Sequence, residues 1–447
     1  MKKLFGTDGV RGVANKELTP KLAFELGKAG AYVLTKNATG TPKVMVAKDG
    51  RRSGDMLEAA LTAGLCSIGA IVYHCGVIPT PAVAYLIKKY KFDAGVMISA
   101  SHNPMQDNGI KFFNASGLKL PDSLEEEIES IIPNLDDIPC PTGADVGVVK
   151  SCPYALEDYA SFLVSTVPSL RLDGMKVALD CANGATSVVA PIVFEKLGAE
   201  VHTLHHRPNG ININANCGST HMDDLKKFVV SQSMDLGLAF DGDGDRMLAV
   251  DKNGQDIDGD MIMAICGLDL YEQGQLDTIV ATVMSNQGLV AFCRKHGIAM
   301  HQTNVGDRYV LEKMIEEDLP LGGEQSGHVI FREYNTTGDG ILAGVQLLSV
   351  LVRKKKQLHE LAQMMEVFPQ VLINAKVPNN RKGELMTCPK IKKVQAGIEA
   401  QLGEYERILV RPSGTEPVVR VMIEGRDQAQ ITKWAQELVA AIESSLT

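Results

Sequence analysis

Three segments of the chain repeat one pattern of hydrophobic and polar positions. They cover residues 43–76, 176–210 and 278–307, and each opens with a short β-branched run, passes through a small polar loop and continues with apolar residues at helical spacing. A glycine and a second short apolar run close each segment. This order is typical of a strand, a helix and a second, parallel strand. We therefore expect three α/β domains with sheets rich in parallel strands.

The second segment shows the pattern in most detail. Val177 to Leu179 form the expected strand, and Val201 begins the next one. Gly198 is the expected end of the helix, because glycine takes a positive φ at little cost. Helical spacing predicts that five apolar side chains of this helix point inward: Val188, Val189, Ile192, Val193 and Leu197.

The last part of the chain follows another pattern. A strand and a polar linker precede a helix over residues 391–402, two strands flank residues 411–417, and a helix over 427–444 ends the chain. The predicted fold class is thus α/β, with three similar mixed-sheet α/β domains plus a smaller C-terminal α+β domain. The predicted domains are residues 1–154, 155–255, 256–369 and 370–447.

Composition and charge limit the partners. Hydrophobic residues make up 45% of the chain and charged residues 22%, as in an ordinary soluble protein. Nine cysteines include no Cys-x-x-Cys pair, so we expect neither a disulfide framework nor a zinc site, but buried thiols in a reducing compartment. The net charge of −9 disfavours nucleic acid and acidic membrane surfaces as partners.

The distribution of apolar residues bears on location. No apolar run reaches the roughly 20 residues that span a bilayer. The opening stretch MKKLFGTDGVRG lacks the apolar run of a secretory signal. We therefore expect a cytoplasmic protein that has no membrane partner.

Three aspartates alternate with two glycines directly after a short apolar run. Asp241, Asp243 and Asp245 would repel one another unless a cation lay among them, and the glycines let the backbone turn tightly enough for all three to face it. An EF-hand loop is excluded, because Arg246 stands where that loop needs glycine and Lys252 where it needs glutamate. We expect Mg²⁺, the alternative being a solvated acidic turn. Arg246 would suit a phosphate held against that metal.

A serine follows another apolar strand. In Ser-Ala-Ser-His-Asn-Pro, residues 99–104, a turn accounts for the asparagine and proline but needs neither Ser101 nor His102. No Gly-x-Ser-x-Gly elbow surrounds Ser101, which disfavours acyl hydrolysis. Phosphoserine there would bring close to two negative charges and an oxygen that could complete the coordination of a cation on the aspartates. We therefore predict that Ser101 carries a phosphoryl group to an acceptor hydroxyl.

A tight loop between the last two strands is suited to an anion. Arg411, Ser413, Gly414 and Thr415 lie in it, and Arg420 lies on the strand that follows. Small residues let backbone N–H groups approach an oxyanion, and arginine binds phosphate in a bidentate manner. The loop is not a Walker P-loop, and a hairpin turn with incidental arginines is the alternative.

A further polar segment follows Pro320. Glu324, Ser326 and His328 stand at alternate positions. On an extended segment alternate side chains point the same way, as a pocket that binds sugar hydroxyls or an amine would require. A structural role for the histidine is the alternative.

Five motifs together resemble the α-D-phosphohexomutase family. FGTDGVRG, SASHNP, DGDGDR, GGEQSGH and RPSGTEP occur in family order over essentially the whole chain. The resemblance implies four domains around a central cleft, an active phosphoserine at Ser101, and Mg²⁺ bound by that phosphate and the three aspartates. It also implies that Glu324, Ser326 and His328 contact the sugar, and that residues 411–415 with Arg420 bind the phosphate that is not transferred. Arg11 and Lys111 match positions that assist phosphoryl and proton transfer, and the identity of the general base stays open.

Two shorter stretches resemble the branch of that family that acts on an amino sugar. They are residues 212–221, NINANCGSTH, and residues 305–308, VGDR. The resemblance implies interconversion of glucosamine 6-phosphate and glucosamine 1-phosphate through a 1,6-bisphosphate, on the route to UDP-N-acetylglucosamine, with glucosamine 1,6-bisphosphate or a related sugar bisphosphate as activator. The nearest alternative is a mannose or glucose phosphate substrate. A sugar-phosphate sensor and a metal-dependent phosphatase are further alternatives, and a homodimer is left open.

Overall fold

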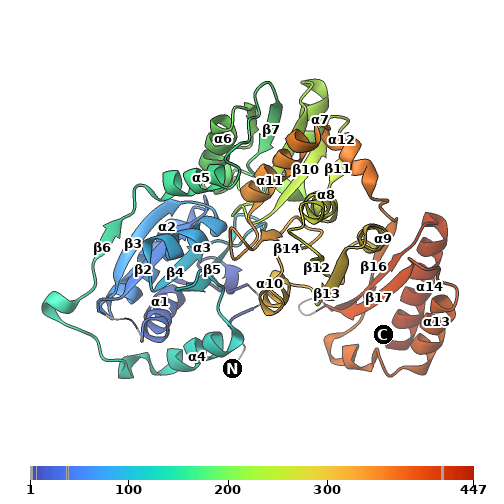
Figure 1. Cartoon of the computed structure of the whole chain (residues 1–447). Helices are drawn as coiled ribbons and strands as arrows, with labels where there is room; N and C mark the ends of the chain where they lie inside the picture. Colours follow the sequence, from blue (N-terminus) through green and yellow to red (C-terminus); the bar gives the residue numbers. More distant parts are fainter. Residues whose placement is uncertain (1–3, 7, 37, 39, 414–416, 447) are drawn as a thin grey trace. The chain divides into compact units, whose positions relative to one another are not determined.

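The computed structural model describes residues 4–6, 8–36, 38, 40–413 and 417–446 (Figure 1). By its internal contacts the chain divides into two compact units. The first comprises Met1–Met284 and Ala299–Gln363, and the second comprises Ser285–Ile298 and Met364–Thr447. Within the described residues, no helix is long and apolar enough to cross a membrane.

The first unit begins with a six-stranded sheet in the order β1-β5-β4-β2-β3-β6. Strands β2, β3, β4 and β6 are parallel, whereas β5 runs antiparallel to both of its neighbours, β4 and β1. Alternate residues of the central strands, such as Val44, Val46 and Val96, share one core with α1 and α2. The bounds are β1 Val10–Val13, β2 Lys43–Lys48, β3 Ile71–Val77, β4 Ala94–Ile98, β5 Asp107–Asn114, β6 Val149–Ser151, α1 Pro20–Leu34, α2 Ser53–Cys66, α3 Thr80–Tyr90, α4 Asp122–Ile131 and α5 Ala155–Ser165.

A second sheet has five strands in the order β11-β10-β9-β7-β8. Strand β7 lies parallel to β8 and β9, while β10 returns antiparallel to β9. The predicted end of α6 is confirmed, since Gly198 follows it with a φ of 97°. One inward side chain was predicted wrongly, because Val188 is 55% exposed while Ala190 and Phe194 are buried. The bounds are β7 Lys176–Asp180, β8 Glu200–Leu204, β9 Leu236–Phe240, β10 Met247–Asp251, β11 Asp256–Ile257, α6 Thr186–Lys196 and α7 Asp223–Ser231.

A third sheet has the order β13-β12-β14-β15. Strands β12, β13 and β14 are parallel, and β15 pairs antiparallel with β14. Helix α11 is capped at its start, because the Asp339 carboxylate accepts a hydrogen bond from Leu342 N. The bounds are β12 Thr278–Thr282, β13 Ala299–Thr303, β14 Leu321–Gly323, β15 Val329–Phe331, α8 Gly259–Glu272, α10 Asp307–Glu316 and α11 Gly340–Lys354.

The second unit is built on an antiparallel sheet in the order β16-β18-β17. Its core joins Val419 and Val421 of the central strand to Trp434 and Leu438 of the last helix. The unit also includes α9, Gln287–His296, from the third repeated segment. The predicted fold class is confirmed, as mixed α/β sheets precede a smaller α+β part. The bounds are β16 Gln370–Lys376, β17 Arg407–Pro412, β18 Val418–Glu424, α13 Pro389–Glu399 and α14 Gln428–Leu446.

Candidate active site

Ser101 and Asp241 meet at the ends of two strands. Ser101 follows β4, and Asp241 follows β9. The Ser101 Oγ donates a hydrogen bond to Asp241 Oδ2 at 2.5 Å, and the serine is only 2% exposed. Gly242 allows this approach, because a Cβ on it would lie 2.5 Å from the Ser101 carbonyl oxygen. The structure thus brings the predicted phosphoryl carrier to the predicted metal loop.

The three aspartates of that loop form one buried cluster. Their carboxylate oxygens lie within 4.8 Å of one another, and each residue is at most 4% exposed. Gly244 turns the loop with a φ of 72°, a value that favours glycine. Among the described residues, Asp243 Oδ1 and Asp245 Oδ1 are buried without a hydrogen-bond partner. Buried oxygens without partners fit a hard cation such as Mg²⁺, so the donor set agrees with the predicted metal.

The charges of these aspartates are set by their neighbours. Burial, together with the charges of Asp245 and Asp243, raises the pKa of Asp241 well above its ordinary value. Burial would also raise the pKa of Asp245, but the hydrogen bond and charge of His328 and the charge of Lys111 hold it well below the ordinary value. A cluster whose members repel one another in this way favours a bound cation.

Lys111 joins the aspartate cluster to the start of the chain. This residue of β5 is 2% exposed, and its Nζ lies 2.8 Å from Asp243 Oδ2 and 3.0 Å from Asp8 Oδ2. Burial would lower the pKa of Lys111, but the charges of Asp243 and Asp8 raise it. The lysine is therefore a cation at neutral pH. Arg11, on β1, forms an ion pair with the same Asp8.

Sequence reasoning missed several residues that complete a ring of charges. Lys119 Nζ lies 2.6 Å from both Asp8 Oδ1 and Asp307 Oδ2. Asp307 Oδ2 lies 3.4 Å from His328 Nε2, and His328 Nδ1 lies 3.6 Å from Asp245 Oδ2. Asp8 and Asp307 stand inside the stretches FGTDGVRG and VGDR, which drew attention to them without showing their partners. Nothing in the sequence marked Lys119.

Two more side chains border the serine and the metal loop. Arg246 is partly buried, with Nε 3.9 Å from Asp245 Oδ1, and the aspartates raise its pKa against the effect of burial. His102 Nδ1 lies 3.4 Å from Ser101 Oγ. Burial, with the charges of Arg246 and Arg11, lowers the pKa of His102, so its ring is neutral at pH 7 and able to accept a proton.

The predicted sugar-binding segment has another local shape. Residues 324–328 form the loop of the β14–β15 hairpin rather than an extended strand, since Gly323 pairs with Val329. Glu324 and Ser326 remain neighbours, with Ser326 Oγ 3.5 Å from Glu324 Oε2. His328 instead lies buried against Asp245. The extended geometry was therefore predicted wrongly, because a period of two also fits a short hairpin loop.

The predicted anion-binding residues lie in the second unit. Arg411 on β17 stands directly opposite Arg420 on β18. Burial and the charge of Arg420 lower the pKa of Arg411, as expected for two like charges that face each other. Ser413 is buried and donates its backbone N–H to Val418 O. Gly414 and Thr415 lie outside the described residues.

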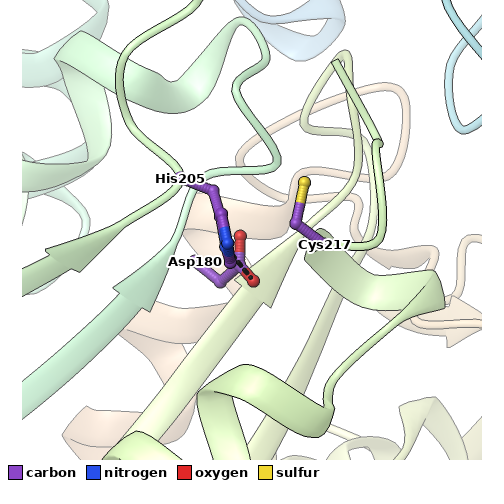
Figure 2. Close-up of side chains that lie close together, drawn as sticks. All are labelled: Asp180, His205 and Cys217. Atoms are coloured by element: carbon purple, nitrogen blue, oxygen red, sulfur yellow. Dashed lines mark hydrogen bonds and ion pairs between the residues drawn. The ribbon is translucent and has the colours of Figure 1, made fainter. Parts of the chain in front are cut away.

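A second cluster in the first unit combines Asp180, His205 and Cys217 (Figure 2). Its chemistry favours hydrogen bonds over a metal. The Asp180 carboxylate already accepts from Ala182 N at 2.9 Å, Gly218 N at 3.0 Å and His205 Nδ1 at 3.0 Å. Burial, with the charge of Asp180, raises the pKa of the Cys217 thiol to about 12, so a thiolate ligand is disfavoured at neutral pH.

Comparison with known proteins shows which family the chain belongs to. Four models of the phosphoglucomutase/phosphomannomutase family match in order: domain I over residues 2–138, domain II over 157–254, domain III over 258–368 and the C-terminal domain over 372–441. The chain belongs to this family, and the family predicted from the five motifs is confirmed.

One relative in this family is similar to the chain in sequence over its whole length, and two solved structures share its fold. The phosphoglucosamine mutase of Acetivibrio thermocellus is 56% identical over 449 residues, which cover 100% of both chains. A phosphoglucomutase/phosphomannomutase family protein from Burkholderia thailandensis has a similar structure, with a TM-score of 0.83, 24% identity, and coverage of 100% of this chain and 98% of the other. The N-acetylphosphoglucosamine mutase of Aspergillus fumigatus, solved with GlcNAc-6P and magnesium, gives a TM-score of 0.70 at 16% identity, covering 99% and 96%.

Proposed function

We propose that the protein is a phosphoglucosamine mutase, an isomerase that interconverts glucosamine 6-phosphate and glucosamine 1-phosphate. One observation carries the proposal: the Ser101 Oγ lies 2.5 Å from Asp241 Oδ2, beside buried oxygens of Asp243 and Asp245 that have no hydrogen-bond partner in the described part of the chain. The 56% identity to the phosphoglucosamine mutase of Acetivibrio thermocellus supports the choice of substrate, and the alternative of a mannose or glucose phosphate is not favoured.

The reaction is proposed to pass through phosphoserine. Phosphorylated Ser101 donates its phosphoryl group to the free hydroxyl of the sugar phosphate, so the bond from phosphorus to the serine oxygen breaks and a bond to the sugar oxygen forms. The resulting glucosamine 1,6-bisphosphate turns end for end, and its other phosphate returns to Ser101. Glucosamine 1,6-bisphosphate or a related sugar bisphosphate would act as activator.

Asp241, Asp243 and Asp245, with the phosphate of Ser101, would hold Mg²⁺. Bound there, the ion would withdraw negative charge from the phosphoryl group. Lys111 is held as a cation by Asp243 and Asp8, so its role is to offset negative charge rather than to accept the first proton. Arg246, which lies beside Asp245, and Arg11, which pairs with Asp8, add further positive charge to the site.

A neutral group is needed to accept the hydroxyl proton. His102 fits this role, because its pKa is lowered and its Nδ1 lies 3.4 Å from Ser101 Oγ. Glu324, Ser326 and His328 are proposed to contact the sugar. Arg411, Ser413, Gly414, Thr415 and Arg420 are proposed to bind the phosphate that is not being transferred, because paired arginines grip phosphate well. Domain bounds, a cytoplasmic location and a homodimer stay predictions.

Rates on the 6-phosphates of glucosamine, glucose and mannose, measured with Mg²⁺ and catalytic bisphosphate, test the proposal. The glucosamine ester should be preferred, and Ser101→Ala should lose turnover by at least about 1,000-fold, since loss of a nucleophile removes the whole covalent route. Preference for glucose or mannose 6-phosphate would contradict the substrate. Release of inorganic phosphate in place of isomerisation would indicate a phosphatase.

A further inference from the structure

The backbone at Ser101 has an uncommon conformation that something must hold. Ser101 has a φ of 52°, which residues other than glycine rarely adopt. Its own N–H donates to Ser99 Oγ at 2.9 Å. The carbonyl groups of Ser101 and Asn103 accept hydrogen bonds from two other side chains. These are Arg51 and Asn214.

Arg51 supports the serine loop from the loop that follows β2. It is 2% exposed, and its Nη2 donates to Ser101 O at 2.9 Å and to Asn103 O at 2.8 Å. Its Nη1 donates to the carbonyl oxygens of Pro104 and Asp107. The carboxylate of Asp49 fixes the guanidinium in turn, with Oδ2 2.9 Å from Nε.

Asn214 meets the same two carbonyl groups from a distant part of the chain. Its Nδ2 donates to Ser101 O at 2.8 Å and to Asn103 O at 3.0 Å. A side-chain amide has two N–H bonds, so both donors of Asn214 are used. The residue is buried, and it too lies in the left-handed region, with a φ of 56°. Each carbonyl oxygen therefore receives one donor from Arg51 and one from Asn214.

The Asp180 cluster holds the segment that carries Asn214. Asp180 binds His205 at the start of the segment (Figure 2). The Asp180 carboxylate also accepts a hydrogen bond from the Gly218 N–H at the end of the segment. Asn214 N donates to Ala182 O at 2.9 Å, and Arg52 N donates to Gly210 O at 2.9 Å. Residues 205–218 are thus fixed at both ends by Asp180, and Asn214 between them binds the serine loop.

We infer that Asn214 is a positioning residue for phosphoryl transfer: its amide clamps the Ser101 loop so that the serine oxygen stays against Asp241. This inference rests on the proposed function. Arg51 binds the two carbonyl groups from the segment between β2 and α2, and Asn214 binds them from residues 205–218. The clamp gives a reason for the many hydrogen bonds that hold residues 205–218, although none of their side chains belongs to the cluster of Asp241, Asp243 and Asp245.

Two glycine variants test the clamp. Asn214→Gly removes the amide and keeps the positive φ without strain. Asn216→Gly is the matched control, because Asn216 lies two residues away with a φ of 53° and is exposed. We expect kcat of the Asn214→Gly enzyme to fall by on the order of 100-fold with KM nearly unchanged, since misplacing a reacting group costs about that much. The Asn216→Gly enzyme should match the wild type.

Phosphate uptake separates the clamp from the proposed function. Intact mass would follow the transfer of phosphate from glucose 1,6-bisphosphate to Ser101, and Asn214→Gly should slow it as much as kcat. Wild-type kcat and uptake in that variant, or an equal loss in Asn216→Gly, would overturn the inference. If the wild type takes up phosphate but does not isomerise glucosamine 6-phosphate, the proposed function fails while slowed uptake in Asn214→Gly still supports the clamp. No uptake by the wild type would overturn both.

Discussion

The Ser101 hydroxyl donates a hydrogen bond to the Asp241 carboxylate although 140 positions separate the two residues in the sequence. The contact depends on Gly242, next to the aspartate, whose backbone lies against the Ser101 carbonyl. Because both residues are buried, the contact fixes the serine oxygen beside the carboxylate cluster. The predictions below follow from this arrangement and from the charges around it.

Gly242→Ala should separate the serine from the metal loop. A Cβ there would lie 2.5 Å from Ser101 O and 2.8 Å from Asn214 Nδ2, so the backbone would have to move. We expect turnover to fall by at least about tenfold, measured at saturating substrate. Gly397→Ala in helix α13 is the control: outside the helix's own backbone, a Cβ there would meet no atom of the described residues within 4 Å, and the change should raise stability by about 0.5–1 kcal/mol. Equal activity of the two variants would argue against the close approach.

Lys111→Met should destabilise the fold and also slow the reaction. The lysine is buried against Asp243 and Asp8, and its removal leaves buried carboxylates without their cation. The free energy of unfolding, measured with urea, should fall by about 3–5 kcal/mol. Lys89→Met breaks the more exposed pair with Asp158 and the contacts of Lys89 with the rings of Tyr85 and Tyr90, and should cost less than about 2 kcal/mol. A similar loss of unfolding free energy in both variants would contradict the conclusion that Lys111 is a buried cation paired with buried carboxylates.

His205→Asn should weaken the fold more at acid than at alkaline pH. The hydrogen bond to Asp180, with the charges of Asp180 and Asp224, raises the pKa of His205 above its ordinary value. The stability it contributes is therefore fully present below the unfolded-state pKa of about 6.5 and is lost as pH rises through the folded-state pKa. Thermal unfolding of the wild type and the variant, measured from about pH 5.5 to about pH 9, gives the difference in stability between them at each pH.

His206→Asn gives the opposite sign and serves as the control. Burial and the charge of Arg207 lower the pKa of His206, so protonation opposes the folded state. The stability of the His206→Asn variant should therefore rise relative to that of the wild type as the pH falls. The same pH trend in both histidine variants would show that the pairing with Asp180 does not hold His205 in its charged form.

Local patterns predicted the elements well because each repeated segment is a complete strand, helix and strand. The failures have physical causes. Helix α6 is apolar on more than one face, so spacing alone directed Val188 inward although it is exposed. The alternation at residues 324–328 fitted a strand but belongs to a hairpin loop, because β14 and β15 are too short to extend through it.

The candidate site was predictable in part. The alternating aspartates indicated a cation, and the structure gathers their oxygens within 4.8 Å. The charge ring of Asp8, Lys119 and Asp307 was not predictable, because its members come from three distant segments and meet only in the folded chain. The amide clamp of Asn214 was hidden for the same reason: an asparagine in a polar loop is most often a turn residue.

Manganese in place of Mg²⁺ tests the central claim that the serine phosphate and the aspartates share one cation. Electron–nuclear double resonance of the Mn²⁺-loaded enzyme, phosphorylated on Ser101, would report coupling between the metal and ³¹P. We predict a strong coupling that disappears after dephosphorylation, and a metal affinity reduced at least about tenfold by Asp243→Asn. Tight Mn²⁺ binding without ³¹P coupling in the phosphorylated enzyme, or unchanged affinity in Asp243→Asn, would contradict the account.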